Sequence, residues 1–316
     1  MIPKYVDVHC HPNLAGLKEN QDEVIATMAE EGVLGVVVGT NLESSREAVA
    51  LAHKHEHLFA TVGLHPNYTQ KEEFDRRAFA ELLEQPKVVG VGECGIDYFR
   101  QSTTTAGEVG GEGWKEKQWE VFRQHADLAL EHDKPLMVHC RPSKGSMDAY
   151  EEVADYLEFM PHQNVQHSSV EQGRGTQEVV QYPDSAQADI ARGRKGVERV
   201  ERAVPRGNMH FFVGSLDVAR RFWSLGFTTS FTGVLTFTKE YDEVVREAPL
   251  DMLLTETDAP WAAPVPHRGE VNQPVYVRHV LDAVARIKGI SPDEASRAIL
   301  QNAERVFGIS LGARVA

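Results

Sequence analysis

The stretch Val6-Asp7-Val8-His9-Cys10-His11 reads as a short buried strand that ends in two histidines. Side chains alternate between the two faces of a strand, so His9 and His11 project side by side while Cys10 points to the opposite face. Neutral imidazoles paired in this way suit a divalent transition metal. Two ordinary histidines at a strand end would give the same spacing, and the metal interpretation therefore depends on the rest of the chain.

Outward from this stretch, short apolar runs alternate with longer amphipathic segments. Continuous runs of Val, Ile and Leu are typical of parallel strands that are buried on both faces. We expect strands at residues 5–10, 33–38, 58–62, 88–93, 135–141, 209–212, 228–233 and 252–258. Helices are expected at residues 21–31, 44–55, 74–83, 115–132, 216–225, 241–247, 275–288 and 292–307. Eight strand–helix units predict an α/β fold, the (β/α)8 TIM barrel.

In a barrel of this kind the chemistry lies at the carboxyl ends of the strands. Several of the expected strands end in a residue that can bind metal or phosphate, namely His11, His65, Glu93, His139, His210 and Asp258. For any one of them the alternative is a polar group satisfied within the core. Their common position at strand ends favours one shared site over that alternative.

Length and charge bound the class of protein. A chain of 316 residues with 41% hydrophobic content could form two domains or one α/β barrel, and we expect a single barrel domain over residues 1–316. The net charge of -14 argues against a protein that coats nucleic acid with a generally basic surface. It does not argue against an enzyme that holds phosphate through metal ions.

The cellular compartment is predicted from apolar runs and cysteines. No run of 18 apolar residues occurs and the N-terminus enters a strand directly, so neither a membrane span nor a signal peptide is expected. The three cysteines, Cys10, Cys94 and Cys140, each follow a candidate ligand and should point away from the site, into the layer between barrel and helices. An odd number without a disulfide pattern favours a reducing compartment, and we expect a cytoplasmic protein.

One insertion interrupts the alternation at about residues 101–113. This segment is rich in Ser, Thr and Gly, which predicts a flexible loop. Because it follows the strand that carries Glu93, it belongs to the catalytic face. It could cover bound substrate, or it could be an insertion without a role in binding.

A second insertion, at about residues 162–208, is far longer than a helix-to-strand connection requires. It precedes the sixth expected strand, which predicts a position on the face opposite the catalytic one. Its basic run, Arg192 to Arg206, could be a nucleic-acid patch. We favour a solvated helix, because Glu198 and Glu201 are interspersed among the cations.

Taken together, the motifs at the strand ends resemble the TatD family of metal-dependent deoxyribonucleases, itself similar to the amidohydrolase-type barrels. Each motif alone is weak, but the set is specific and covers most of the chain apart from the two insertions. The matching segments are Val6–His11, Gly63–Pro66, Gly92–Tyr98, Val138–Arg141, Met209–Ser215, Glu256–Trp261 and Pro264–Pro274. The family usually has Cys where this chain has Phe211, a position expected to point away from the metals.

The resemblance implies a site for two divalent ions (Zn, Mg or Mn) whose ligands are His9, His11, Glu93, His139, His210 and Asp258. Two cations need an anionic bridge, and Glu93 can supply it. His9, His11 and Asp258 would complete one ion, and His139 and His210 the other. Asp258 could also hold and deprotonate the attacking water, so Asp258 and Glu93 are the expected catalytic residues.

The sixth strand has an alternative ligand. His167 also ends a possible short strand, and its distance from His139 is closer to an uninterrupted strand spacing. We choose His210, because the segment that follows it continues the family pattern and nothing after His167 does.

Substrate-binding residues are expected at the mouth of the barrel. His65 could bind the scissile phosphate, and Arg141 follows His139 on the same face. His267, Arg268 and Asn272 lie on the loop after the eighth strand, where barrels often bind phosphate and an Arg fork matches phosphate geometry. Any of these residues could instead brace the loop. Glu256 and Asp7 lie one layer lower and are interpreted as supports for the ligands.

The expected function is that of a hydrolase acting on ester bonds, a phosphodiesterase that trims an end of DNA by two-metal-activated water. RNA is the alternative polymer. Neither a membrane nor an obligate protein partner is expected. The same site could serve another ester, a lactone or an amide, because fold and metals do not fix the substrate. A binding protein that keeps its metals without turnover is the alternative from another class.

Overall fold

The computed structural model describes residues 2–99, 113–160 and 205–311. Apart from Met160, these residues belong to one compact unit. Both expected insertions, at about 101–113 and about 162–208, fall almost wholly outside the described residues, as does His167. The predictions made for those two segments therefore stay predictions.

The strands of the described residues form one parallel sheet in sequence order. They are β1 (Tyr5–Cys10), β2 (Val33–Val38), β3 (Leu58–Val62), β4 (Val88–Asp97), β5 (Leu136–Arg141), β6 (Gly207–His210), β7 (Thr228–Phe231) and β8 (Leu253–Thr255). The sheet is nearly closed on itself, because the Thr255 hydroxyl of β8 donates to the Val6 carbonyl of β1 at 2.9 Å. Eight parallel strands in a near-closed barrel confirm the predicted TIM-barrel class.

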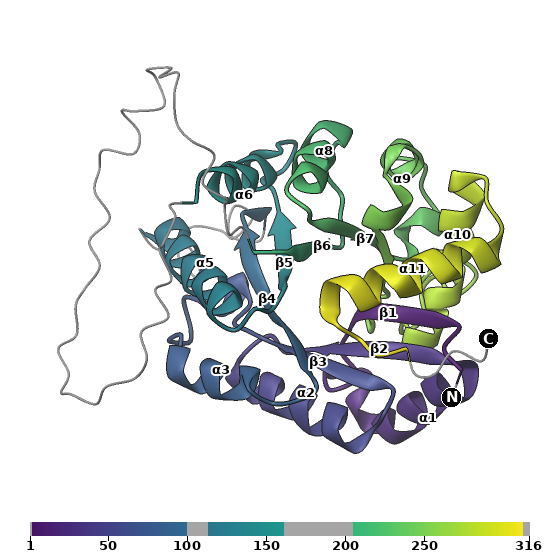
Figure 1. Ribbon diagram of the computed structural model, residues 1–316, viewed down its shortest axis with the longest axis horizontal. Helices are drawn as coiled ribbons and strands as arrows, with labels where there is room; N and C mark the ends of the chain where they lie inside the picture. The colour runs from purple at the N-terminus through teal and green to yellow at the C-terminus, as the bar shows by residue number, and fades with distance from the viewer. Residues whose placement is uncertain (1, 100–112, 161–204, 312–316) are drawn as a thin grey trace. The chain divides into compact units, whose positions relative to one another are not determined.

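Helices surround the strands, as Figure 1 shows for the described residues. They are α1 (Gln21–Glu31), α2 (Leu42–Lys54), α3 (Arg76–Leu83), α5 (Trp114–Glu131), α6 (Asp148–Phe159), α8 (Leu216–Ser224), α9 (Asp242–Glu247), α10 (Val277–Lys288) and α11 (Pro292–Phe307). Single 3-10 turns occur at η1 (Lys18–Asn20), η2 (Pro66–Tyr68), η3 (Gly233–Thr236), η4 (Leu250–Met252) and η5 (Pro274–Tyr276). Helix α6 is not among the helices expected from the sequence.

Burial explains why the strands consist of continuous apolar runs. Every residue of β2 is buried, because one face of a barrel strand packs inside the barrel and the other under the helices. The three cysteines are buried and free. The Cys10 thiol donates to the Val36 carbonyl at 3.5 Å, on the side of β1 away from His9 and His11. These thiols therefore act as core groups.

Strand β4 is longer than the sequence suggests and is irregular in its middle. It continues to Asp97, and its register shifts between Val91 and Cys94. A Cβ added to Gly95, which has a φ of +133°, would lie 2.0 Å from the His139 carbonyl oxygen. Glycine therefore allows β4 to approach the end of β5 closely, and this approach positions Glu93 next to His139.

Strands β6 and β8 end earlier than expected. β6 ends at His210 because Phe211 has a φ of +46°, and β8 ends at Thr255, three positions before Asp258, which has a φ of +51°. Positive φ in residues other than glycine is costly and often occurs at functional sites. The backbone therefore leaves the sheet where the candidate ligands begin. None of the described helices is both long and apolar enough to cross a membrane.

Candidate metal centre

The structure brings the expected metal ligands together at the carboxyl ends of the strands. His9 and His11 come from β1 and its end, and the rings of His9 and His210 stack with centroids 3.8 Å apart. The remaining members are Glu93 on β4, His139 on β5 and Asp258 beyond β8. Among the described residues, three overlapping groups have potential ligand atoms within 4.8 Å of one another, namely His9, His11 and Glu93; His9, His210 and Glu256; and His65, Glu93 and His139.

Glu93 lies between two pairs of histidines. Its Oε1 lies 2.9 Å from His210 Nε2 and 3.0 Å from His139 Nδ1. Its Oε2 lies 3.5 Å from His9 Nε2 and 3.9 Å from His11 Nε2. One carboxylate therefore directs one oxygen to each pair, which is the arrangement that a bridge between two cations requires.

Asp258 completes the side of the cluster that β1 forms. The Nε2 atoms of His9 and His11 are 3.0 Å apart, and Asp258 Oδ1 lies 3.7 and 3.4 Å from them. The Asp258 side chain is 14% exposed, against 0% and 1% for the two histidines. It is therefore the member of this group that solvent reaches.

The far ring nitrogens of His11 and His139 have hydrogen-bond partners, which fix the ring nitrogen that is left for a metal, whereas His210 Nδ1 has only the Glu256 carboxylate nearby. His11 Nδ1 lies 2.9 Å from the Val38 carbonyl, which only a proton on Nδ1 can satisfy. His139 Nε2 lies 3.3 Å from Asp97 Oδ2, and His210 Nδ1 lies 3.6 Å from Glu256 Oε1. A proton on the far nitrogen of His11 and of His139 would leave the nitrogen that faces the cluster available to a metal, as in the histidine ligands of metal sites.

His65 is oriented the other way. Its Nδ1 accepts a hydrogen bond from the Asn67 backbone N–H at 3.0 Å, so a neutral ring carries its proton on Nε2. That nitrogen lies 3.3 Å from Glu93 Oε1. His65 is thus close enough to Glu93 and His139 to form a potential metal-binding group with them. Its tautomer, however, makes Nε2 a hydrogen-bond donor rather than a metal ligand. Burial lowers its pKa, so the ring is neutral near pH 7.

The electrostatics of the cluster favour a bound cation. Burial raises the pKa of the Glu93 carboxyl, but His65, His210, His9 and His139 outweigh burial and hold that pKa well below its usual range. Burial lowers the pKa of His210, but Glu93 and Glu256 raise it well above its usual value. A buried anion surrounded by nitrogen donors is the donor set that a divalent transition metal prefers. The residues present therefore fit metal binding.

Two carboxylates below the cluster act as supports. Asp7 accepts from the backbone N–H groups of His9 and Thr257 at 3.2 and 2.9 Å, which ties β1 to the loop after β8. Glu256 accepts from the Ser230 hydroxyl at 2.9 Å and from the Phe211 N–H. Asp97 is a support that was not expected from the sequence, although it follows Glu93 by two strand alternations; its Oδ2 lies 3.3 Å from His139 Nε2.

The expected substrate-binding residues lie in different environments. Arg141 follows His139 on β5, and its guanidinium lies 4.1 Å from the Phe99 ring centroid. His267 stacks on Tyr276 at 3.8 Å and pairs with Glu270 at 3.1 Å. Both residues are partly exposed, and their contact with a substrate stays a prediction.

Arg268 and Asn272 differ sharply in exposure. Arg268 is exposed, lies over the Phe237 ring at 3.9 Å and donates to the Ala263 carbonyl. Asn272 is fully buried, and its amide donates to the carbonyls of Thr257 and Trp261. Because both amide hydrogens are used on carbonyls, the structure favours the alternative that Asn272 braces the loop, and a role in substrate binding stays a prediction.

A TIM barrel with histidine and carboxylate ligands at the carboxyl ends of its strands defines a metal-dependent hydrolase of the amidohydrolase-like fold. The family model for TatD related DNases matches residues 6–308. The chain therefore belongs to the TatD family, as the motifs predicted.

Relatives of known sequence or structure agree with this assignment. The uncharacterized metal-dependent hydrolase YabD of Bacillus subtilis (strain 168) is 31% identical over 308 residues, which cover 96% of this chain and 99% of that protein. The crystal structure of the TatD homologue YjjV from Escherichia coli K12 matches with a TM-score of 0.73 and 24% identity, covering 98% of this chain and 100% of that one. A TatD family hydrolase from Entamoeba histolytica matches with a TM-score of 0.67 and 18% identity, with coverage of 98% and 100%. The two solved structures support the fold.

Proposed function

We propose that this metal-dependent hydrolase cleaves phosphodiester bonds of DNA and removes nucleotides from an end. The observation that carries the proposal is the position of Glu93, whose two oxygens each face a pair of histidine nitrogens. A pair of cations held by these residues would supply charge to stabilise both the attacking and the leaving oxygen of a phosphoryl group. The family description, TatD related DNase, favours DNA as the substrate class.

The residues of the chain divide the remaining work. When bound, divalent ions would neutralise charge on the phosphate and lower the pKa of water. Asp258, the solvent-accessible carboxylate of the cluster, takes the proton of the attacking water. His65 carries its proton on Nε2 and donates it in a hydrogen bond to a phosphate oxygen at the mouth. His11, His139 and His210 each direct a ring nitrogen at the site, where it would hold a metal ion.

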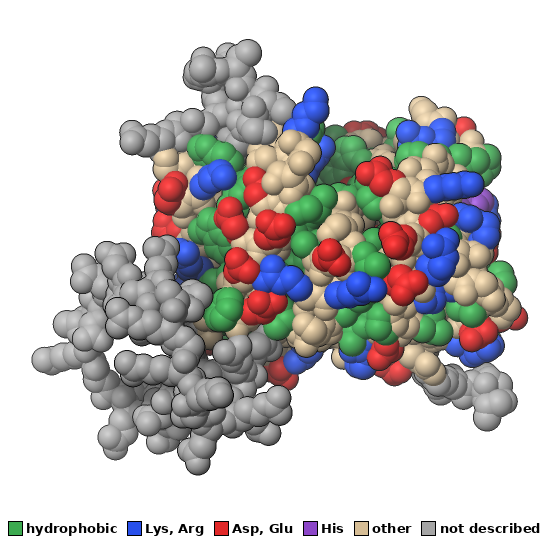
Figure 2. Space-filling model, turned by 90° about the horizontal axis from the view of Figure 1, so that it is seen from above, with side chains coloured by type: hydrophobic (Ala, Val, Ile, Leu, Met, Phe, Trp, Pro, Cys, Tyr) green, Lys and Arg blue, Asp and Glu red, His purple; other side chains and the backbone are tan. Residues whose placement is uncertain are grey.

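The surface charge agrees with a metal-centred mode of binding. On the face drawn in Figure 2, acidic and basic side chains are interspersed among apolar ones. A chain with a net charge of -14 repels DNA at long range. Affinity must then come from the metal centre and from cations placed at particular points of the mouth.

The test is a hydrolysis assay with end-labelled single- and double-stranded oligonucleotides in Mg, Mn or Zn. We expect stepwise shortening from one end, abolished by a chelator and restored by adding metal. The Asp258→Asn variant, purified identically, controls for contaminating nuclease. If the metal-loaded protein cleaved no oligonucleotide but hydrolysed lactones, amides or other esters, the proposal would be wrong in its substrate. If it hydrolysed none of these, the protein would be a metal-retaining binding protein.

A further inference from the structure

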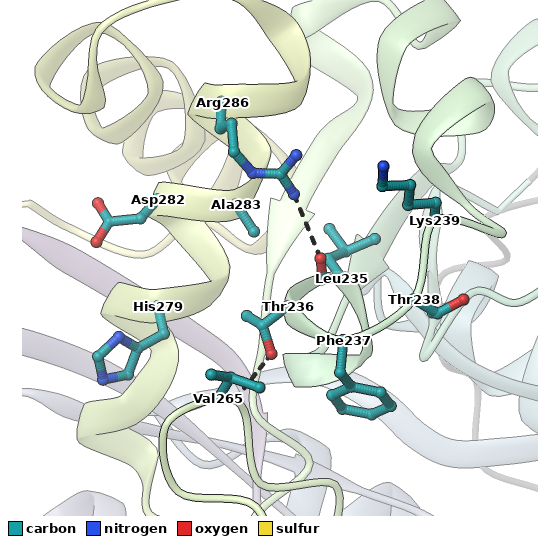
Figure 3. A pocket seen from close by; sticks show the side chains of 10 residues that line it. All are labelled: Leu235, Thr236, Phe237, Thr238, Lys239, Val265, His279, Asp282, Ala283 and Arg286. Carbon is teal, nitrogen blue, oxygen red and sulfur yellow. Dashed lines mark hydrogen bonds between the residues drawn. The ribbon is translucent and has the colours of Figure 1, made fainter.

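A pocket outside the metal centre lies between the turn after β7 and helix α10 (Figure 3). Its volume is about 540 Å³. Its wall includes Thr236, Phe237 and Lys239 after β7, Val265 from the loop after β8, and Asp282 and Arg286 from α10. A volume of this size holds a nucleotide-sized ligand. The metal-binding residues take no part in its wall.

Two cations of this pocket have no acidic partner. Within residues 2–99, 113–160 and 205–311, neither Lys239 nor Arg286 makes an ion pair. Arg286 reaches from α10 toward the Leu235 carbonyl, at 3.5 Å (Figure 3). Asp282 is the single carboxylate among the lining residues, and Figure 3 shows it on the side of α10 away from Lys239. Two cations without a carboxylate partner at one pocket can bind an anionic group such as a phosphate.

An aromatic platform borders the same pocket. The Phe237 side chain is 43% exposed, although phenylalanine is normally buried. The Arg268 guanidinium lies 3.9 Å from its ring centroid. An exposed aromatic ring with a stacked arginine beside unpaired cations is how proteins hold a base and its phosphate in single-stranded nucleic acid.

The loop after β8 joins the pocket to the metal centre. Val265, in the pocket wall, lies seven positions after Asp258, and its N–H donates to the Thr236 hydroxyl at 2.8 Å. Seven residues span at most about 25 Å. A nucleic-acid strand advances about 3.4 Å per nucleotide, so about seven nucleotides cover that distance. Trp261 lies between Asp258 and Val265 in the sequence. It is 50% exposed, and its ring centroid is 5.4 Å from that of His11.

We propose that the pocket between the β7 turn and α10 is a second nucleotide subsite, in which Lys239 and Arg286 bind a phosphate of the DNA strand and Phe237 stacks on a base. The proposal rests on the proposed function, because the strand reaches this subsite from the metal centre across Trp261. The subsite makes the enzyme prefer strands long enough to fill both places. It adds affinity and takes no part in bond cleavage.

The test compares two substrates that differ in reach. Thymidine 5′-(p-nitrophenyl phosphate) has one phosphate, which the metal centre must take, whereas an oligothymidylate of about eight nucleotides spans both places. In Lys239→Gln and Arg286→Gln we expect KM for the oligothymidylate to rise about tenfold, the factor that loss of one charge-assisted hydrogen bond gives. We expect kinetics on the one-phosphate ester to stay unchanged. Arg297→Gln, which removes an exposed cation of α11, is the matched control and should behave as the parent.

A binding experiment distinguishes failure of this subsite from failure of the proposed function. Fluorescence anisotropy of labelled oligothymidylate, with metal removed, needs no turnover, and each substitution should lower the salt dependence of binding by about one phosphate contact. Equal oligothymidylate KM and equal salt dependence in the parent, Lys239→Gln and Arg286→Gln would overturn the subsite even in an active nuclease. Pocket-dependent binding of inorganic phosphate or thymidine monophosphate that does not compete with the oligonucleotide would also overturn it, in favour of an effector site.

Discussion

The histidines of the metal centre are oriented by partners that sequence spacing does not reveal. His11, His139 and His210 each direct one ring nitrogen to a carbonyl or carboxylate and the other into the cluster. His65 reverses this pattern through the Asn67 N–H. Because the partner of the far nitrogen fixes the tautomer, neighbouring histidines can be ligands or donors within one cavity.

Asp258→Asn should separate metal binding from turnover. The amide can still coordinate weakly but cannot accept a proton from water, so we expect kcat on oligonucleotides to fall by about 10² or more. Metal content, measured by elemental analysis after gel filtration, should stay close to that of the parent. A variant with near-normal rates would exclude Asp258 as the base.

Glu256→Gln should weaken metal binding through His210. Glu256 lies 3.6 Å from His210 Nδ1 and is itself held by Ser230. Loss of such a carboxylate typically costs 10- to 100-fold in metal affinity, and we expect that loss in a calorimetric titration with Zn or Mn. Glu152→Gln, which changes a carboxylate bonded to Tyr98, is the control and should leave the affinity unchanged. Equal metal affinity in Glu256→Gln and the parent would show that His210 needs no help from Glu256.

At the scale of the element, strand β4 shows what the sequence could and could not predict. Its apolar first half and Glu93 were evident from the Val-Val-Gly-Val run. Its continuation to Asp97 was missed, because glycines break the apolar pattern. The end of β6 was predicted too late for a different reason. Phe211 has a positive φ, and nothing in the local sequence predicts a positive φ for a phenylalanine.

Gly95→Ala tests the close approach of β4 to β5. A Cβ at Gly95 would lie 2.0 Å from the His139 carbonyl oxygen, so the strands must separate near two ligands. We expect the free energy of unfolding to fall by about 2 kcal/mol or more, together with a loss of metal affinity.

Gly226→Ala is the matched control, since Gly226 also has a positive φ, +83°, but nothing lies within 4 Å of its added Cβ. It should show the cost of backbone strain alone, about 1 kcal/mol, with metal affinity intact. If the two variants lost equal stability and kept equal metal affinity, the contact with His139 would have no part in forming the site.

For the whole molecule, the barrel was predictable because the same sequence pattern occurs in every strand–helix unit. Each strand–helix unit repeats the same pattern, so omitting α6 or misplacing β6 by two residues did not change the fold class. The pocket beside α10 had no such signal. Lys239 and Arg286 are 47 positions apart and belong to no motif, and only the packing of α10 against the β7 turn brings them together.

The pH dependence of stability should reveal a buried histidine far from the metal ligands in sequence. His125 on α5 accepts from the Leu64 N–H at 3.0 Å, and its Nδ1 lies 2.8 Å from the Val121 carbonyl, so the buried ring is neutral. Burial lowers its pKa from 6.5 to about 4, although the bond to Val121 opposes that shift. The folded state therefore binds fewer protons than the unfolded state between these values, and stability present above pH 6.5 is lost as the pH falls toward 4.

The expected loss from this one group is about 2 kcal/mol between pH 7 and pH 5, from a pKa shift of this size. The measurement is urea unfolding at both pH values for the parent and His125→Gln, each with a chelator so that metal release does not contribute. All other titrating groups are shared by the two proteins, so the difference between their pH dependences isolates His125. The parent should lose about 2 kcal/mol more than the variant on acidification, because only the parent must protonate the ring against the Leu64 N–H. Parallel losses in the two proteins would mean that His125 titrates alike in the folded and unfolded states, and that acid destabilises the barrel through other groups.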